Sequence, residues 1–196
     1  MVFLENPNKL PKISEITILD HHTSAMTKII RARKNDYALL TQIGVPSFLT
    51  AHGHSATKEV VDAFMKQYYS EEAFKRELEI ESNIYHFIFQ DDTPVGYAKI
   101  LLNATHPDIA LPKVTKLERL YLLKEYFGLG LAQQLVLFTI DYAKKFGQEG
   151  MWLHVWIENK RAVAFYKKMG FNVIGAYDFK LTDDHYNPNH HMYLEF

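Results

Sequence analysis

The segment 125–134, EYFGLGLAQQ, places small residues at positions 128, 130 and 132, where an apolar strand-like run gives way to a helix-like one. Glycines at such a junction let an anion approach the backbone, because no side chain blocks the N–H groups at the start of the helix. The chemistry indicated is the binding of a phosphate or pyrophosphate. A turn with a purely structural purpose is the alternative, since a lone G-x-G pattern is weak evidence of function.

Two known phosphate-binding patterns fit this segment poorly. A nucleotide P-loop needs Gly-Lys-Ser/Thr, but Gly130 is followed by Leu131 and Ala132, so the lysine and the magnesium-binding hydroxyl are missing. The dinucleotide pattern G-x-G-x-x-G matches at Gly128 and Gly130 but has Gln133 at its third glycine position. The spacing excludes the P-loop and leaves a nicotinamide-dependent oxidoreductase as a disfavoured alternative.

Two longer stretches, LERLYLLKEYFGLGLAQQLV and WLHVWIENKRAVAFYKKMGF, resemble the core motifs of the Gcn5-related N-acetyltransferase family, Q/R-x-x-G-x-G/A and N-x-x-A-x-x-F-Y-x-x-x-G-F. Gly130 and Ala132 match the small positions of the first motif. The matches to the second motif are Asn159, Ala162, Phe165, Tyr166, Gly170 and Phe171. The resemblance runs from about residue 27 to the end of the chain, so we expect an N-terminal extension, 1–26, and an acetyltransferase domain, 27–196.

The resemblance implies a single α/β domain with a central mixed sheet that is antiparallel in its first half, splayed at the acetyl-CoA site and covered by helices on both faces. It also implies transfer of acetyl from acetyl-CoA to a primary amine of a small molecule, by direct attack in a ternary complex. The residues that it assigns to the coenzyme are Leu120, Tyr121, Leu122, Phe127, Gly128, Leu129, Gly130, Leu131, Ala132 and Asn159. Asn159 is equally suited to be a plain helix N-cap.

Phe127 departs from the family pattern, which has Gln or Arg at this position. A phenyl ring cannot donate a hydrogen bond to phosphate, so we expect the backbone amides from Gly128 to Ala132 to hold the pyrophosphate more weakly than in the family. A non-catalytic sensor of acetyl-CoA is therefore a further alternative.

Glu118 and Tyr166 are the expected catalytic residues. Removing the proton of a lysine-like amine at pH 7 costs about 4 to 5 kcal/mol, and Glu118, in the strand before the glycine segment, is the nearest candidate base. Tyr166 matches the family's general acid, which protonates the departing thiolate. The alternatives are an ordinary ion-paired Glu118 beside Arg119 and a Tyr166 that serves only in packing. For the oxyanion, the family uses a backbone amide on the strand, here around Leu120 to Leu122.

The sequence holds ten histidines, concentrated in HGH, 52–54, and HYNPNHH, 185–191. Neither cluster has the i, i+4 helical spacing with a carboxylate that a zinc hydrolase uses, so we expect no metal. His52 or His54 is suited to line the acceptor pocket. Tyrosines and acids elsewhere suit a cationic amine, by cation–π contact or by charge: Tyr68, Tyr69, Tyr85, Asp183 and Asp184. The stretches YSEEAFKREL, PVGYAKI and LERLYLLKEY resemble a bacterial branch that includes polyamine acetyltransferases.

Apolar periodicity and turn residues predict the elements that must position these groups. Strands are expected at 13–19, 28–33, 116–123 and 151–156, a hairpin at 83–102 and a final strand pair at 172–181 and 190–196. Helices are expected at 35–52, 55–69, 70–78, 131–146 and 159–170, with an N-cap at Asn35/Asp36 and a capping box that joins Ser55 or Thr57 to Glu59.

Composition limits the remaining choices. Apolar residues make up 47% of the 196 residues and charged residues 23%, with a formal net charge of -1, so no global basic field exists to hold nucleic acid or an anionic membrane. The chain has no cysteine, which excludes disulfides and thiolate sites. It has no apolar run of transmembrane length and no signal-peptide pattern, so we expect a cytoplasmic protein. A homodimer through the exposed C-terminal strands is a further expectation.

Overall fold

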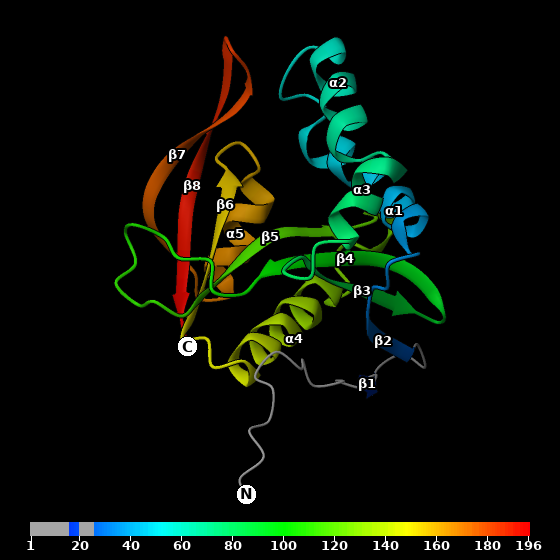
Figure 1. Ribbon diagram of the computed structural model, residues 1–196, viewed down its shortest axis with the longest axis vertical. Helices are drawn as coiled ribbons and strands as arrows, with labels where there is room; N and C mark the ends of the chain where they lie inside the picture. The colour runs from blue at the N-terminus through cyan, green and yellow to red at the C-terminus, as the bar shows by residue number, and fades with distance from the viewer. Residues whose placement is uncertain (1–15, 20–25) are drawn as a thin grey trace, which may run out of the picture.

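The computed structural model describes residues 16–19 and 26–196, which form one eight-stranded sheet with the order β1-β2-β3-β4-β5-β6-β8-β7. Helices lie on both sides of the sheet (Figure 1). The strands are β1 (Ile16–Leu19), β2 (Met26–Arg31), β3 (Ile84–Gln90), β4 (Thr93–Leu101), β5 (Val114–Leu122), β6 (Gly150–Trp156), β7 (Asn172–Thr182) and β8 (His185–Glu195). The only parallel pair among them is β5 with β6, so the prediction of a mixed sheet with an antiparallel first half is confirmed.

The predicted hairpin forms from β3 and β4. Its strands are rich in β-branched and aromatic residues, which suit a pleated surface. Asp91 and Asp92 make the turn with φ angles of 48° and 64°. These positive values suit the two central residues of a tight hairpin, and aspartate tolerates them better than most side chains.

The sheet splays between β5 and β6. These strands pair at only three positions, Val114 with Gly150, Thr115 with Met151, and Lys116 with Trp152. β5 then continues to Leu122 while it remains paired with β4, and β6 continues to Trp156. The edge of β5 that faces β6 therefore has no strand partner beyond Lys116, as the family resemblance implied.

The helices are α1 (Tyr37–His52), α2 (Lys58–Tyr68), α3 (Glu71–Leu78), α4 (Leu131–Lys145) and α5 (Lys160–Lys168), with a 3-10 turn η1 (Lys124–Tyr126) before the glycines. They cover two separate apolar cores. Side chains alternate across a strand, so Ile84 and Ile88 of β3 pack in the core beneath α4, whereas Tyr85 and Phe87 pack in the core beneath α1 and α3.

The helix ends agree only in part with their predicted caps. Ser70 caps α3, because its hydroxyl accepts the Ala73 N–H at 3.2 Å. The predicted capping box of α2 is wrong, since Thr57 precedes the helix without a side-chain cap bond. Asp36 precedes α1, but its carboxylate accepts the N–H of Arg33 at 2.7 Å instead of a helix amide. That bond tightens the turn after β2.

Part of the predicted extension belongs to the sheet. The backbone of Ile16–Leu19 forms β1 and pairs antiparallel with β2, and the rest of 1–25 lies outside the described residues. The division at residue 26 stays a prediction. Within the residues that the structure describes, no helix combines the length and the apolar character that a membrane crossing requires.

Candidate active site

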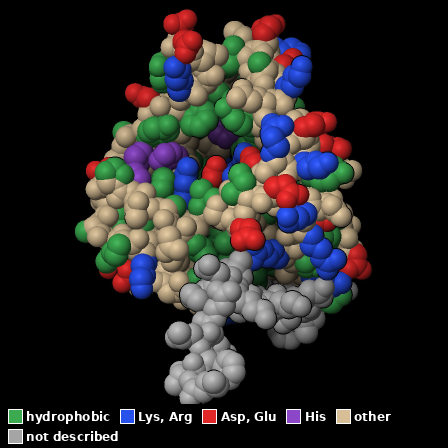
Figure 2. Space-filling model, in the orientation of Figure 1, with side chains coloured by type: hydrophobic (Ala, Val, Ile, Leu, Met, Phe, Trp, Pro, Cys, Tyr) green, Lys and Arg blue, Asp and Glu red, His purple; other side chains and the backbone are tan. Residues whose placement is uncertain are grey.

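A cleft with a volume of about 1130 Å³ follows the splay of the sheet. Figure 2 shows the molecule hollowed on this face, with hydrophobic side chains around the hollow and charged side chains inside it. Its walls come from α1, α2, β5, the glycine turn, β6, α5 and the β7–β8 hairpin. The sequence-predicted residues that line it are Glu118, Leu120, Tyr121, Leu122, Phe127, Gly128, Gly130, Leu131, Ala132, Asn159 and Tyr166. Leu129 is exposed and is not one of the lining residues.

The glycine turn leaves backbone amides free at the start of α4. Gly128 and Gly130 have φ angles of 81° and 76°, and a Cβ added to either would meet no atom within 4 Å. The first helical bond runs from the Gln134 N–H to the Gly130 carbonyl at 3.0 Å, so the amides at 131–133 have no partner inside the helix. Free N–H groups, the positive end of the helix dipole and open space together suit a phosphate.

Arg161 lies directly over Phe127. Its guanidinium carbon is 3.6 Å from the centroid of the phenyl ring, and both residues line the cleft. A guanidinium stacked on an aromatic face is held by cation–π attraction and keeps its N–H donors free at the edge. The site therefore has a cation beside the glycine turn, although the family's Gln/Arg position is occupied by Phe127.

The register of β4 and β5 decides which amides face the cleft. The Leu123 N–H donates to the Val95 carbonyl on β4 at 2.9 Å, and Tyr121 pairs with Tyr97 two residues earlier. Bonding alternates along an antiparallel pair, so the Tyr121 amide also points to β4. The amides of Leu120 and Leu122 then point to the open side of β5. Of the three residues expected for the oxyanion, these two present their N–H groups to the cleft.

Tyr166 and Asn159 come from the N-terminal two turns of α5 and its cap. Tyr166 is 8% exposed and packs edge-on against Phe171, with ring centroids 5.7 Å apart. Burial raises its pKa well above the ordinary tyrosine value, which keeps the phenol protonated and able to donate a proton at neutral pH. Asn159 caps the helix by accepting the Ala162 N–H at 3.2 Å and also lines the cleft.

Glu118 lies on the cleft wall at the edge of a buried charge cluster. Its carboxylate is 3.4 Å from the Lys99 ammonium, which in turn lies 2.6 Å from a carboxylate oxygen of Glu77. Arg119 binds the other Glu77 oxygen at 2.8 Å, and Tyr85 donates its hydroxyl to the same carboxylate. Glu118 is thus ion-paired, which agrees with the alternative to a catalytic role, but its side chain also lines the cleft.

Glu77 anchors α3 to the sheet through this cluster. Burial alone would raise its pKa, but the positive charges of Arg119 and Lys99 outweigh burial and hold the pKa below the ordinary value. The Tyr85 hydroxyl serves the same carboxylate, and its ring is only 1% exposed. The expectation that Tyr85 contacts a cationic substrate is therefore wrong.

Aromatic side chains dominate the wall opposite the glycine turn: Phe48, Phe64, Tyr68, Tyr69, Trp156 and Phe179. Glu59 of α2 and His52 of α1 lie among them. Burial lowers the pKa of His52 to about 4, with a smaller contribution from His54, so its ring is neutral at pH 7. The ring of His54 lies beside that of Trp156, with centroids 5.2 Å apart and planes tilted by 46°, and His54 does not line the cleft. Asp183 and Asp184 are not lining residues either.

The sequence profile of the Acetyltransferase (GNAT) family matches residues 54–171, which include the glycine turn, the splayed strands and α5. The chain belongs to the GNAT acetyltransferase family. It is an acetyl-CoA-dependent N-acetyltransferase, and neither the oxidoreductase nor the non-catalytic sensor is favoured.

Individual relatives agree with this assignment. An uncharacterized N-acetyltransferase of Lactobacillus delbrueckii subsp. lactis is 25% identical over 157 residues, which cover 80% of this chain and 91% of that one. An uncharacterized N-acetyltransferase of Mycobacterium tuberculosis is 37% identical over 97 residues, 50% of this chain and 58% of that one. The PaiA N-acetyltransferase of Thermoplasma acidophilum, solved with coenzyme A, has a TM-score of 0.69 at 22% identity, with 87% of this chain and 99% of that chain covered.

Sequence reasoning missed the groups that reach the site from distant segments. Arg161 was inside the quoted NKRAVAFYKKMG stretch, and the missing donor at Phe127 was a signal to look for a second cation nearby. Glu77 and Lys99 carry no such signal, because 22 residues separate them in the chain and only the packing of α3 on β4 brings them together.

Proposed function

We propose that the acceptor of this N-acetyltransferase is a small primary amine that enters from the side of α1, α2 and the β7–β8 hairpin. One observation carries the proposal: a single cleft connects the free amides of the glycine turn with Glu118, Tyr166 and the aromatic wall. A coenzyme held at the turn can extend its arm through the splay, and an amine on the aromatic wall can meet its thioester there.

Binding of the coenzyme is assigned to one end of this cleft. The amides of Gly128 to Ala132 hold the pyrophosphate, and Arg161 supplies the charged donor that Phe127 lacks. The open edge of β5 offers strand-like hydrogen bonds to the amides of the pantetheine arm, since β6 pairs with β5 only as far as Lys116.

Three groups divide the chemistry. Glu118 takes the proton of the ammonium, directly or through water, and the amine nitrogen then forms its bond to the acetyl carbon. One N–H group, that of Leu120 or that of Leu122, stabilises the oxyanion that develops on the carbonyl oxygen, because two amides two residues apart on a strand cannot both reach one oxygen. As the carbon–sulfur bond breaks, Tyr166 donates its phenolic proton to the departing thiolate, and the attached nitrogen loses its second proton, which restores the phenol, directly or through water. The aromatic wall excludes water, which strengthens each of these electrostatic interactions.

The acceptor's chemistry follows from the wall that faces Glu118. Its aromatic rings favour an amine with an apolar body and offer cation–π contact to a charged nitrogen, and Glu59 is placed for a second cation. A polyamine, the acceptor class of the branch that the sequence resembles, would use both carboxylates. A monoamine with an aromatic or branched apolar body would use Glu118 and the rings alone.

The experiment is a rate measurement of thiol release from acetyl-CoA with a panel of amines: spermidine, an arylalkyl monoamine and the N,N-dimethyl form of each. We expect turnover with at least one primary amine and none with its dimethyl form. Glu118→Gln should lower kcat/KM for the active amine about 100-fold, whereas Glu125→Gln, an exposed carboxylate outside the cleft, should leave it unchanged. Tight binding of acetyl-CoA without turnover on any primary amine would favour the sensor.

Two further expectations from the sequence stay predictions. The edge strand β7 exposes Val173 and Tyr177, and an exposed edge of this kind suits pairing with a second copy. Light scattering coupled to size exclusion would give the mass in solution, and a monomer at all concentrations would refute the homodimer. The second expectation, a cytoplasmic location, also stays a prediction.

A further inference from the structure

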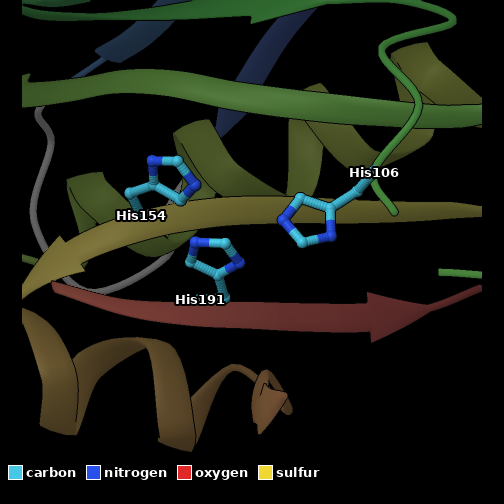
Figure 3. A group of neighbouring side chains, drawn as sticks. All are labelled: His106, His154 and His191. Carbon is cyan, nitrogen blue, oxygen red and sulfur yellow. The ribbon is translucent and has the colours of Figure 1, made fainter. Parts of the chain in front are cut away.

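Three histidine rings meet beside the cleft, although they are far apart in the sequence (Figure 3). His154 of β6 and His191 of β8 are directly opposite each other on neighbouring strands, and His106 reaches them from the loop between β4 and β5. One ring nitrogen of each residue lies within 4.8 Å of the other two. Convergence of three imidazoles from three segments is the arrangement of a metal site rather than of a local sequence pattern.

Three ring nitrogens of this cluster lack a hydrogen-bond partner among the described residues. Nε2 of His154 and both ring nitrogens of His191 are closed off from solvent and make no hydrogen bond to the described residues. His106 and His191 are only 7% and 9% exposed. Native structures rarely leave buried polar atoms unsatisfied, so these nitrogens point to a ligand.

A carboxylate lies beside the rings. Asp108 Oδ2 is 3.9 Å from His106 Nδ1, and the Asp108 N–H donates to the same nitrogen at 3.2 Å. Gly175 pairs with His191 on the edge strand, and Asp108 Oδ2 lies 3.6 Å from where a Cβ of Gly175 would be. The missing side chain thus leaves the carboxylate next to His191, where it can orient a ligand ring and offset the charge of a cation.

We propose that His106, His154 and His191 bind a divalent transition-metal ion, with zinc the best fit. Zinc–nitrogen bonds of about 2.0–2.1 Å put tetrahedral ligand atoms about 3.4 Å apart, so the ligand nitrogens close by up to about 1.4 Å on binding. The rings of His154 and His191 are stacked, with centroids 4.4 Å apart and planes 19° from parallel, so binding also turns these rings until their in-plane lone pairs converge on the ion. Three imidazoles suit zinc, nickel, copper or cobalt and disfavour magnesium and calcium, which take oxygen ligands. This site contradicts the expectation from the sequence that the protein binds no metal.

The bound ion would tie the loop between β4 and β5 to the two strands. His154 also lines the cleft, so the metal site borders the cleft on that side. The positive charge of Lys116 opposes metal binding. Its ammonium lies 5.2 Å from the centroid of the Trp152 ring, in the neighbourhood of His154, and repels a cation there.

The test is a titration of zinc chloride into tag-free, chelator-treated protein by calorimetry, with metal content measured after gel filtration. We expect one zinc per chain and a rise in the melting temperature. His106→Ala and His191→Ala should each weaken zinc binding at least tenfold. His190→Ala is the matched control, because His190 is the next residue on β8 and points to the opposite face, and its zinc affinity should equal that of the wild type.

Acetyl-CoA binding by each variant checks its folding and does not depend on the metal site, so failure here leaves the proposed acetylation untouched. No zinc binding by the wild type, or equal binding by wild type and both variants, would overturn the metal site. If a variant fails to bind acetyl-CoA, cobalt(II) replaces zinc in the wild type. Intense visible absorption of a four-coordinate ion supports the site, and its absence overturns it.

Discussion

The two ends of the cleft are built in different ways. At the end proposed for the coenzyme, the cleft is lined by one turn, between Gly128 and Ala132, and by two side chains of one helix, Arg161 and Tyr166. At the acceptor end, the groups are side chains from α1, α2, β5, β6 and β7. One of them, Glu118 of β5, is ion-paired to a buried charge cluster that joins α3 to the sheet.

The difference has a physical cause. A pyrophosphate is the same in every coenzyme molecule, and backbone amides at a helix N-terminus recognise it without any particular side chain. An acceptor is recognised by rings and carboxylates, which must converge from distant segments. Coenzyme binding should therefore resist changes that unsettle the acceptor end, and the predictions below separate the two ends in decreasing order of effect.

Glu77→Gln should have the largest effect, on stability. The change leaves the buried Arg119 without its carboxylate partner and Lys99 with Glu118 alone, 3.4 Å away, which costs about 3 kcal/mol of the free energy of unfolding. Chemical denaturation at pH 7 measures it. At a permissive temperature the folded variant should bind acetyl-CoA with wild-type affinity, because α3 does not touch the glycine turn. If the variant lost affinity for acetyl-CoA in proportion to its loss of stability, the two ends of the cleft would be energetically coupled.

The same carboxylate gives a pH dependence with a definite sign. The folded-state pKa of Glu77 lies below its unfolded value of about 4.3, so its contribution is complete above that value and is lost as the pH falls through the folded pKa. The stability gap between wild type and Glu77→Gln should therefore be constant from pH 7 to about 5.5 and narrow below about pH 4.3. A gap that widens on acidification would contradict this.

Tyr166→Phe should lower kcat about 100-fold, since loss of a general acid costs this order of rate. The phenyl ring keeps the packing against Phe171, so the dissociation constant of acetyl-CoA should not change. Tyr193→Phe removes a buried hydroxyl that has no hydrogen-bond partner among the described residues and lies outside the cleft lining, and it should keep full activity. Full activity of the Tyr166→Phe variant would mean that Tyr166 is not the general acid and contributes only to packing.

The contrast between the two ends also explains how much the sequence could predict. The strand and helix pattern and the glycine turn were predictable because local periodicity and a fixed motif spacing encode them. The splay was predictable only because the family resemblance implied it. The Glu77 cluster and the three-histidine cluster were not, because each forms only when separate segments pack. Tyr85 was misassigned for the same reason. The sequence does not show on which face of the sheet a strand tyrosine lies, and only the position of α3 shows that Tyr85 is buried.

Gly130→Ala should act on the coenzyme end alone. A Cβ at this position meets no atom, so the cost is the positive φ, about 1–2 kcal/mol for a non-glycine residue. The methyl group also stands where the phosphate approaches, and the dissociation constant of acetyl-CoA should rise about tenfold. Gly147→Ala is the matched control, with φ of 69°, open space and a place outside the cleft lining. It should lose similar stability and keep its coenzyme affinity.

Arg161→Gln should have a smaller effect, a three- to tenfold rise in the dissociation constant of acetyl-CoA, because one charge-assisted bond is lost while the backbone amides remain. Lys160→Gln removes the neighbouring charge, which lies outside the cleft lining and pairs with Glu158 at 3.5 Å, and it should change nothing. Equal losses of acetyl-CoA affinity in the two variants would mean that the binding depends on the net charge of this region and not on a specific contact of Arg161.

Phe127→Leu should have the smallest effect. Its ring contributes by holding the Arg161 guanidinium, and a cation–π contact is worth about 0.5–1 kcal/mol, or two- to fivefold in affinity. If the ring acts only through Arg161, the double variant Phe127→Leu/Arg161→Gln binds acetyl-CoA as well as Arg161→Gln alone. Calorimetry on the wild type, the two single variants and the double variant gives the four dissociation constants of this double-mutant cycle. Losses that simply add would mean that Phe127 contacts the coenzyme itself, and the arginine would then be no substitute for the missing polar side chain at that position.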